Sequence, residues 1–346
     1  MPTLVTGGAG YIGSHACQRL LRDGHQVIAL DNLFRGHRAP MDLLSHAYPR
    51  QFSFVHADVG DTEAVTAAIN EHEIDTVMHF GALAYVGESV EDPLWYYRNN
   101  IAMGIGLLDA CDQAHDGRGI SRFIFSSSCA TYGDPPEGMI PVPENCPQSP
   151  TSPYGYTKLH FEHILKDYAT KRQREDNPIA LTMLRYFNVA GSDRTGMLGE
   201  DHTPETHLIP VGIDAATGKR DSMSIFGTDY PTPDGTCIRD YVHVEDLVDA
   251  HARAMERVQI GEVQAFNVGI GKGYSVREIL DSIKRVSGVD FAVHETDRRA
   301  GDAIALYNDP TKIKATLGWD AQITDIDEIV TTAYTWLKGH PNGYAT

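Results

Sequence analysis

The segment Leu4-Val-Thr-Gly-Gly-Ala-Gly-Tyr-Ile-Gly-Ser-His15 decides the expected fold. A short apolar run, Leu4 to Thr6, leads into Gly7, Gly10 and Gly13 and then into a stretch of helical spacing. Glycines spaced GxxGxxG between a strand and a helix permit a tight turn and let a pyrophosphate approach the helix N-terminus. In a chain with 32 glycines the same spacing also arises as an ordinary glycine-rich turn. Its place between a strand and a helix favours dinucleotide binding.

An acidic residue closes the next expected strand. Asp31 follows the apolar run Val27 to Leu30 and stands 18 residues after Gly13. A carboxylate there accepts hydrogen bonds from the adenosine ribose hydroxyls, whereas it would repel a 2′-phosphate. The predicted cofactor is therefore NAD. Arg35 and Arg38 lie close by in the sequence and leave phosphate binding as the less favoured alternative.

Short apolar runs alternate with stretches of helical spacing up to about residue 190. The expected strands are Leu4 to Thr6, Val27 to Leu30, Phe52 to His56, Thr76 to Phe80, Phe123 to Ser126 and Leu181 to Tyr186. The helix-compatible stretches between them are Ile12 to Arg22, Glu63 to Glu71, Leu94 to Asp112 and Tyr154 to Arg172. Because parallel strands need crossover helices, this order predicts an α/β fold with a Rossmann-type doubly wound parallel sheet.

The alternation fails after Asn188. Residues 189 to 237 are rich in Gly, Pro, Thr and Asp, and helical spacing returns at Val244 to Arg257, Val276 to Val286 and Ile326 to Leu337. We expect an NAD-binding domain over residues 1–188 and a smaller α/β substrate lobe over 189–346, with some segments of the lobe returning to the first domain. Ligands of open α/β sheets bind at the carboxyl edge of the strands, where we expect the lobe to lie.

The composition excludes several classes of partner. The chain has 47 acidic against 29 basic residues, a formal charge of −18, which disfavours nucleic acids and anionic membranes. No apolar run approaches the roughly 20 residues needed to span a bilayer. The five cysteines are widely spaced, with no CxxC pair, and the first strand begins too early to leave room for a signal peptide. We therefore expect a cytoplasmic protein with reduced thiols.

Candidate reacting groups lie near the middle of the chain. Tyr154 and Lys158 are four residues apart, so a helix places them on one face, and Ser128 ends the preceding strand signal. Lowering a tyrosine pKa from about 10 to near 7 takes roughly 4 kcal/mol. A cation about 6 Å away contributes roughly 3 kcal/mol at an effective dielectric near 20. With Lys158 and the positive nicotinamide ring nearby, Tyr154 becomes a workable base.

At this point the motifs resemble a known family. The glycine turn, Asp31, Ser126-Ser-Ser128, the Tyr154/Lys158 pair and Leu184-Arg-Tyr-Phe-Asn-Val189 resemble the extended short-chain dehydrogenase/reductase family. Further motifs are similar to its sugar-nucleotide 4-epimerases; these are His79-Phe80, Val86-Gly-Glu-Ser-Val90, Ser152-Pro-Tyr-Gly155, Gly227-Thr-Asp-Tyr-Pro231, Asp234-Gly-Thr236, Arg239-Asp-Tyr241 and His340-Pro-Asn-Gly-Tyr344. The resemblance extends from Leu4 to the C-terminus.

The resemblance implies a reaction and a set of roles. Tyr154 takes the proton of the sugar 4-hydroxyl while NAD takes hydride from C4, and the keto sugar turns over before the hydride returns. Ser128 would hydrogen-bond the 4-oxygen, and Lys158 would hold the nicotinamide ribose. The expected cofactor-binding residues are Gly7, Gly10, Tyr11, Ile12, Gly13, Asp31, Asn32, Asp58, Val59, Phe80, Asn99, Ser126, Tyr154, Lys158 and Tyr186. Asp58 is equally well explained as a helix cap.

The implied substrate is a UDP-sugar. The residues expected to bind it are Ser128, Asn188, Leu208, Ser224, Phe226, Arg239, Tyr241, Arg299, Asp302 and Leu306. Arg239 and Arg299 would clamp the diphosphate, because planar guanidinium groups bind its oxygens bidentately. Leu208, Ser224 and Phe226 would frame the uracil.

Three positions bear on the choice of reaction and sugar. Related dehydratases and decarboxylases carry acidic residues directly after the strand-end hydroxyl, but this chain has Cys129-Ala130, which favours simple epimerisation. Family members carry a lysine that reaches the NAD phosphates, where this chain has Ala84, so one phosphate contact is in doubt. Leu306 aligns with the position that limits room at the sugar 2-substituent, which disfavours N-acetyl sugars; filling the core explains a buried leucine equally well.

The expected activity is interconversion of UDP-glucose and UDP-galactose. UDP-arabinose/UDP-xylose 4-epimerisation is the alternative within the group, because Ala84-Tyr-Val-Gly-Glu-Ser89 also resembles the pentose enzymes. An NAD-binding sensor without catalysis is the alternative of another class, and such proteins typically lose the Tyr/Lys pair. The family resemblance also predicts a homodimer through the helices at about 93 to 115 and 153 to 173. No HxxxH spacing stands beside a carboxylate, so we expect no catalytic metal.

Overall fold

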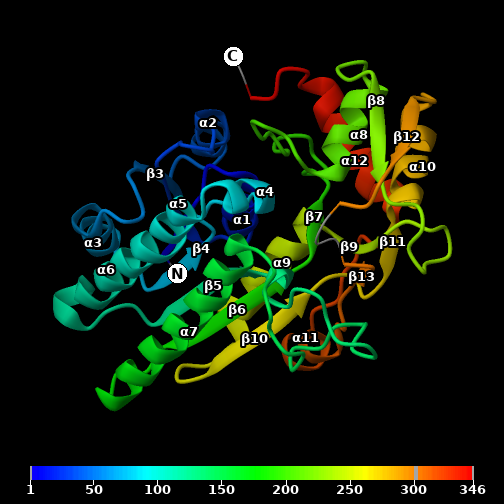
Figure 1. Ribbon diagram of the computed structural model, residues 1–346. Helices are drawn as coiled ribbons and strands as arrows, with labels where there is room; N and C mark the ends of the chain where they lie inside the picture. The colour runs from blue at the N-terminus through cyan, green and yellow to red at the C-terminus, as the bar shows by residue number, and fades with distance from the viewer. Residues whose placement is uncertain (1, 300–302, 345–346) are drawn as a thin grey trace. The chain divides into compact units, whose positions relative to one another are not determined.

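A computed structural model describes residues 2–299 and 303–344 of the chain, shown in Figure 1. The chain divides into two compact units. Unit 1 comprises residues 1–133, 148–185 and 248–266, and unit 2 comprises residues 134–147, 186–247 and 267–346. No helix among the described residues is long and apolar enough to cross a membrane.

Unit 1 is built on a seven-stranded sheet with the strand order β10-β6-β5-β4-β1-β2-β3. Its strands are β1 (Pro2–Thr6), β2 (Gln26–Asp31), β3 (Phe52–His56), β4 (Thr76–His79), β5 (Arg122–Ser128), β6 (Ala180–Tyr186) and β10 (Val263–Val268). The pairs β1–β2, β2–β3, β1–β4 and β4–β5 are all parallel. The strand order reverses direction beside β1, which confirms the predicted doubly wound sheet.

Helices connect the strands of unit 1. They are α1 (Tyr11–Arg22), α2 (Arg38–Ala47), α3 (Thr62–Glu71), α4 (Val86–Glu91), α5 (Pro93–Tyr97), α6 (Met103–Gly117) and α7 (Pro153–Arg174), and α9 (Val244–Arg257) follows later in the chain. The sequence predicted one helix over Leu94 to Asp112, whereas the structure has α5, a π-helical segment at Arg98–Ala102, and α6. Helix α2 was not predicted, because its buried face carries only three residues.

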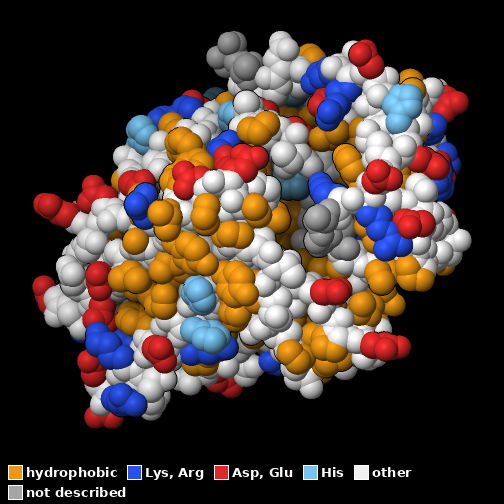
Figure 2. All heavy atoms as spheres, in the orientation of Figure 1, with side chains coloured by type: hydrophobic (Ala, Val, Ile, Leu, Met, Phe, Trp, Pro, Cys, Tyr) orange, Lys and Arg blue, Asp and Glu red, His pale blue; other side chains and the backbone are white. Residues whose placement is uncertain are grey.

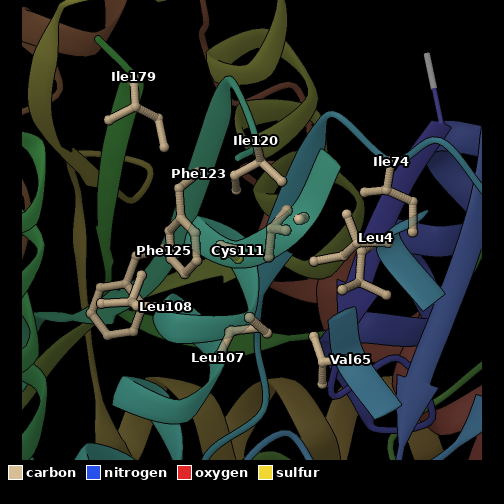
Figure 3. Close-up of a cluster of buried hydrophobic side chains, with 14 of the residues drawn as sticks. Leu4, Val65, Ile74, Leu107, Leu108, Cys111, Ile120, Phe123, Phe125 and Ile179 are labelled. Carbon is tan, nitrogen blue, oxygen red and sulfur yellow. The ribbon is translucent and has the colours of Figure 1, made fainter. Parts of the chain in front are cut away.

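The core of unit 1 explains why these elements pack together. Apolar residues of the strands, such as Leu4 and Phe123, meet the apolar stripe of α6 at Leu107, Leu108 and Cys111. Figure 3 shows these side chains pointing toward one another between sheet and helices. Each is at most 5% exposed. Burial of this apolar surface contributes about 25 cal/mol per Å² to the free energy of folding. It holds the helices against the sheet, and polar residues lie at the ends of the strands.

Unit 2 combines short strands and helices. The strands are β7 (Asn188–Ala190), β8 (Ser222–Phe226), β9 (Ile238–His243), β11 (Gly273–Ser275), β12 (Ala292–Thr296) and β13 (Ala305–Leu306). The helices are α8 (Leu208–Ala216), α10 (Val276–Ser287), α11 (Thr311–Leu317) and α12 (Ile326–Gly339). β9 pairs with β7, β11 and β13, and β8 pairs with β12. The sequence predicted α10 and α12 but not α8 and β8, which lie in the glycine- and proline-rich stretch.

Candidate active site

The glycine turn after β1 is required by its close contacts. Gly7 has φ +69°, and a Cβ there would lie 2.5 Å from the backbone nitrogen of Gly81. A Cβ on Gly13 would lie 2.0 Å from the carbonyl oxygen of Gly7. Gly10 is the N-cap residue of α1 and offers no side-chain cap, and the first turn of the helix contains no acidic residue. Its N-terminal N–H groups therefore suit a pyrophosphate.

Asp31 ends β2 beside this turn. Its Oδ2 accepts from the Ala9 N–H at 3.0 Å, and its Oδ1 accepts from the Leu33 N–H at 2.8 Å. Burial raises the pKa of Asp31, and these two backbone hydrogen bonds oppose that shift. Each carboxylate oxygen keeps a second lone pair for a ribose hydroxyl. The glycine turn and this fixed carboxylate together fit the adenosine diphosphate half of NAD.

The two nearby arginines have carboxylate partners. Arg35 pairs with Glu88 at 2.5 Å and stacks over the ring of Tyr85, and Arg38 pairs with Asp42 at 2.8 Å. These pairs favour NAD over a cofactor with a 2′-phosphate, because both guanidinium groups are engaged elsewhere. Glu88 also holds the backbone next to Ala84 in place. The Tyr96 hydroxyl donates to Glu88 and accepts from the N–H of Tyr85, the residue after Ala84.

Asp58 follows β3 and has a local partner. It accepts from the Asn32 side-chain amide at 2.8 Å and from the Gly60 N–H at 2.8 Å. The cap of α3 is Asp61, which accepts from the Ala64 N–H at 3.0 Å, so the interpretation of Asp58 as the helix cap is wrong. The Asn32–Asp58 pair lies just past the ends of the neighbouring strands β2 and β3, and the adenine contact of Asp58 stays a prediction.

Tyr154 and Lys158 lie one turn apart near the start of α7. Ser152 caps this helix by accepting from the Gly155 N–H, and Pro153 occupies its first position. The Lys158 Nζ donates to the Ser126 carbonyl at 2.8 Å and lies 5.8 Å from the centre of the Tyr154 ring. Tyr154 is 7% exposed and Lys158 3%. The cation therefore lies beside the phenol in a site nearly closed to water, where its field is weakly screened.

Burial sets the charge of Lys158. Desolvation lowers its pKa to about 7, and the attraction of Glu162 opposes that shift. A Lys158 amine that is only partly protonated near pH 7 lowers the pKa of Tyr154 less than the full positive charge assumed from the sequence. The Tyr154 phenolate, once formed, would favour the charged form of Lys158.

The three serines at the end of β5 have three different roles. The Ser126 carbonyl accepts from Lys158, and the Ser127 hydroxyl donates to Glu162 at 2.6 Å. The Ser128 Oγ accepts from the Ala130 N–H at 3.1 Å and remains 7% exposed. The first two bonds fix β5 to α7, and Ser128 sits in the short turn with Cys129 and Ala130 where a reacting hydroxyl was predicted.

A buried ion pair that was not predicted from the sequence lies beside Lys158 and Ser127. Arg185 on β6 forms two hydrogen bonds with Glu162 on α7, at 2.8 and 2.6 Å, and donates to the Tyr132 hydroxyl at 2.9 Å. The Glu162 side chain is 0% exposed and that of Arg185 4%. This pair positions α7, and so Tyr154 and Lys158, against the sheet. Its sequence signal was weak: a glutamate one turn after Lys158 and a lone arginine inside an apolar strand.

Asn100, in the π-helical segment, is a second residue that was missed. Its side chain accepts from the Leu83 N–H at 2.8 Å and donates to the Leu83 carbonyl at 2.9 Å and to the Thr157 hydroxyl at 3.0 Å. It therefore ties the loop after β4 to the first turn of α7. The predicted Asn99, its neighbour, is only half-buried and contacts the Met103 sulfur.

The remaining predicted cofactor residues lie around the carboxyl ends of the strands. Tyr11 and Ile12 open α1, Val59 follows β3, Phe80 follows β4 and Tyr186 ends β6. Phe80 donates its backbone N–H to Thr6, and its ring lies 4.8 Å from that of His251. His79 is buried and bonded to the Thr6 hydroxyl at 2.7 Å, so it is a satisfied core histidine.

The predicted substrate residues that the structure describes, apart from Ser128, belong to unit 2. Register pairs Asn188 with Tyr241 and Leu306 with Arg239 on the strands beside and including β9. Arg239 donates to the carbonyls of Ile238 and Ala303, and Tyr241 is part of the core. Leu306 is buried, in line with either explanation offered for it.

A second group in unit 2 lies at β8 and the start of α8. Ser224 and Phe226 are on β8, the Arg299 guanidinium lies 5.5 Å from the centre of the exposed Phe226 ring, and Leu208 is the first residue of α8. The neighbouring Arg298 instead pairs with Asp229 at the surface. Asp302 lies outside the described residues.

Comparison with known proteins identifies the family. Residues 3–269 match the model of the NAD dependent epimerase/dehydratase family, so the chain belongs to that family. NAD is its cofactor, as the glycine turn and Asp31 predicted.

Individual relatives match along the whole chain. The chain is 45% identical over 99% of its length to a probable UDP-arabinose 4-epimerase of Oryza sativa subsp. japonica, covering 80% of that protein. It is 44% identical to the UDP-glucose 4-epimerase of Lactobacillus helveticus, covering 99% of each. The UDP-glucose-4-epimerase of Stenotrophomonas maltophila, solved with NAD and formylated UDP-arabinopyranose, superposes with a TM-score of 0.92 at 35% identity over 99% of both chains. The predicted resemblance to sugar-nucleotide 4-epimerases is confirmed.

Proposed function

We propose that this protein is a UDP-glucose/UDP-galactose 4-epimerase. The observation that carries the proposal is the buried pair Tyr154 and Lys158, one helical turn apart in the unit that holds the NAD-binding turn and Asp31. A sensor that binds NAD without chemistry would need neither a phenol nor a desolvated lysine beside it. The relatives named UDP-glucose 4-epimerase, matched along their full length, support the same activity.

The residues of this chain would act as follows. Tyr154 takes the proton from the sugar 4-hydroxyl and later returns it, so it serves as base and then as acid. Lys158, held by the Ser126 carbonyl, favours the phenolate through its charge. Ser128 orients the 4-oxygen by a hydrogen bond, and Asp31 with the glycine turn binds the cofactor. Bound NAD supplies the hydride acceptor at C4 and then the donor.

The UDP part of the substrate is assigned to unit 2. Arg239 and Arg299 would bind the diphosphate, and Asn188, Leu208, Ser224, Phe226, Tyr241 and Asp302 would contact the nucleotide or the sugar. Support comes from the exposed Phe226 ring beneath the Arg299 guanidinium, an arrangement that offers a base an aromatic face and a diphosphate a cation. Substitution Arg299→Ala should raise KM more than it lowers kcat.

A pentose substrate is the second candidate. It is favoured by the 45% identity to the probable UDP-arabinose 4-epimerase and by the segment Ala84-Tyr-Val-Gly-Glu-Ser89, which resembles the pentose enzymes. The test is to incubate purified protein, without added NAD, with UDP-galactose, UDP-arabinose and UDP-N-acetylglucosamine in separate reactions. We expect conversion of UDP-galactose and no efficient conversion of the N-acetyl sugar. Turnover of UDP-arabinose alone would replace the hexose proposal by the pentose one.

We also propose that the protein forms a homodimer through α5, α6 and α7. Exposed apolar residues on these helices include Leu94, Ile105 and Tyr156. Figure 2 shows hydrophobic side chains gathered in the region of these helices. Contiguous exposed apolar surface of this kind marks interaction sites. Ile105→Glu should lower the mass measured by light scattering, whereas Ile260→Glu, at an exposed residue outside these helices, should not.

A cytoplasmic location completes the proposal. The five cysteines, all within the described residues, form no disulfide, as expected of thiols in a reducing compartment. Fractionation of cells that produce the tagged protein tests this location directly.

A further inference from the structure

A cluster of two histidines and two glutamates lies in unit 2, in the segment between β7 and α8. Glu200, His202, Glu205 and His207 each offer one ligand atom, and these four atoms all lie within 4.8 Å of one another. Their spacing along the chain, Glu-x-His-x-x-Glu-x-His, differs from the HxxxH pattern considered in the sequence analysis. None of the four was predicted to act in epimerisation.

The contacts within the cluster exceed what hydrogen bonds alone can satisfy. The His207 Nδ1 lies 2.9 Å from an oxygen of Glu200 and 2.9 Å from an oxygen of Glu205. The His202 Nδ1 lies 3.2 and 3.5 Å from oxygens of the same two carboxylates. A ring nitrogen carries at most one proton, so it donates well to one of its two carboxylates. One cation at the centre would bind all four atoms at once.

The separations suit a tetrahedral metal ion. Zn²⁺ binds histidine nitrogen and carboxylate oxygen at about 2.0–2.2 Å, which places neighbouring ligand atoms roughly 3.3 to 3.5 Å apart in a tetrahedron. Glu200 Oε1 lies 2.9 and 3.2 Å from the two Nδ1 atoms, whereas Glu205 presents Oε1 to His207 at 2.9 Å and Oε2 to His202 at 3.5 Å. An ion would therefore bind one or both Glu205 oxygens, and the ligand atoms, which lie within 4.8 Å of one another, would adjust around it. Two carboxylates also balance the double charge of the ion, so neutral imidazoles complete a site without net charge.

The backbone on both sides of the cluster is held in place. Before it, the Gly199 N–H donates to the Tyr344 hydroxyl, and Asp201 accepts from the Tyr344 N–H. After it, His207 is the N-cap residue of α8. The Glu200 side chain is 5% exposed, and that of His207 is 45% exposed. The site is thus anchored at its buried end and open to solvent at His207, which gives an ion a path of entry.

We propose that Glu200, His202, Glu205 and His207 form a binding site for a divalent transition metal of the Zn²⁺ type, distinct from the residues assigned to catalysis. The ion would fix the start of α8. Leu208, the next residue, was predicted to contact the uracil, so the metal would order a segment adjoining the nucleotide site without entering the reaction. The proposal stands or fails separately from the epimerase activity, because its test measures the ion.

The test uses the full chain, stripped of metal by a chelator and titrated with Zn²⁺ in a calorimeter and with Co²⁺ in a spectrophotometer. We expect one tight equivalent of Zn²⁺ per chain and the intense visible absorption of tetrahedral Co²⁺. The variants His202→Gln and Glu205→Gln should weaken this equivalent at least about 100-fold. His46→Gln, at an exposed histidine of α2, is the matched control and should bind as the wild type does.

Each variant is first checked for its NAD content and near-ultraviolet circular dichroism, so that loss of folding is not mistaken for loss of a ligand. If His202→Gln fails this check, Glu205→Gln alone decides. The proposal is overturned by the absence of a tight equivalent in the wild type, by equal Zn²⁺ affinity in the wild type and Glu205→Gln, or by a weak octahedral Co²⁺ spectrum. In the first case the cluster is an ion-pair network of protonated histidines.

Discussion

In unit 1 the buried carboxylate Glu162 meets a guanidinium, whereas in unit 2 the buried carboxylate Asp240 is held by three backbone N–H groups. Glu162 forms two hydrogen bonds with Arg185. Asp240 accepts from the N–H groups of Ile270, Gly271 and Asn308 at 2.8 to 3.1 Å. The two pKa values follow: that of Glu162 is lowered, since Arg185 and its other donors outweigh desolvation, and burial raises that of Asp240 to about 6.

The difference separates two ways of placing functional residues. In unit 1, charged side chains on helices and strands bind one another. The position of α7, and so of Tyr154 and Lys158, therefore depends on the Glu162–Arg185 ion pair. In unit 2 the loops supply the donors, so the region around Arg239 and Tyr241 depends on backbone shape. Gly269 illustrates this, because a Cβ there would lie 2.5 Å from the Asp240 carboxylate.

The largest effect is expected from Tyr154→Phe. The variant lacks the proton acceptor, so kcat should fall by about 10³-fold or more. The Asp31 carboxylate and the glycine turn are untouched, so the NAD released on denaturation should stay at the wild-type amount. Turnover within a few-fold of the wild type would show that chemistry in unit 1 does not depend on this phenol.

The next largest effect is expected from Arg185→Met. It leaves Glu162 buried without its cation, which should lower the free energy of unfolding by about 3–5 kcal/mol in denaturant titrations. The double variant Glu162→Met with Arg185→Met should recover most of that loss, because no buried charge remains. Arg298→Ala removes an exposed, solvent-screened pair and should leave the free energy of unfolding almost unchanged. Equal losses in Arg185→Met and Arg298→Ala would contradict the role given to the buried pair.

Tyr154 and Arg185 show where prediction from sequence succeeds and where it fails. The strands of unit 1 and the glycine turn were predicted because local spacing reports burial and chain direction, and Tyr154 was found because its partner is one turn away. Arg185 and Glu162 are 23 residues apart and meet only through the packing of α7 on the sheet. No local pattern reports such a meeting.

Unit 2 was predicted less well for a related reason. The capping box and strong amphipathic pattern of α10 are local signals, and that helix was predicted. By contrast, α8 begins without a side-chain cap, and β8 is five residues long with a single partner, β12, among the described strands. Asp240 shows the same limit, since its three donors come from residues 30 to 68 positions away.

In unit 2, Asp240→Asn tests the carboxylate held by backbone donors. The asparagine side chain would place its NH₂ group, a donor, against the backbone N–H donors from which Asp240 accepts. The free energy of unfolding should therefore fall by about 1–3 kcal/mol at pH 7. Because the folded pKa of Asp240 is raised from 3.8 to about 6, its contribution is present below pH 3.8 and is lost as pH rises to about 6. The loss in the variant should therefore be larger at pH 4 than at pH 7. A loss independent of pH would show that Asp240 does not titrate in this range.

The last prediction is a slope in pH from Lys158 in unit 1. Its pKa falls from 10.5 to about 7 on folding, so above pH 7 the unfolded chain binds more protons than the folded protein. The free energy of unfolding should then rise with pH by up to about 1.4 kcal/mol per unit relative to Lys158→Met. Lys166→Met, on the same helix, is the control and should leave that slope in place. Parallel curves for the wild type and Lys158→Met would mean that the ammonium keeps its charge in the folded protein, and Tyr154 would then have the full cation beside it before any cofactor binds.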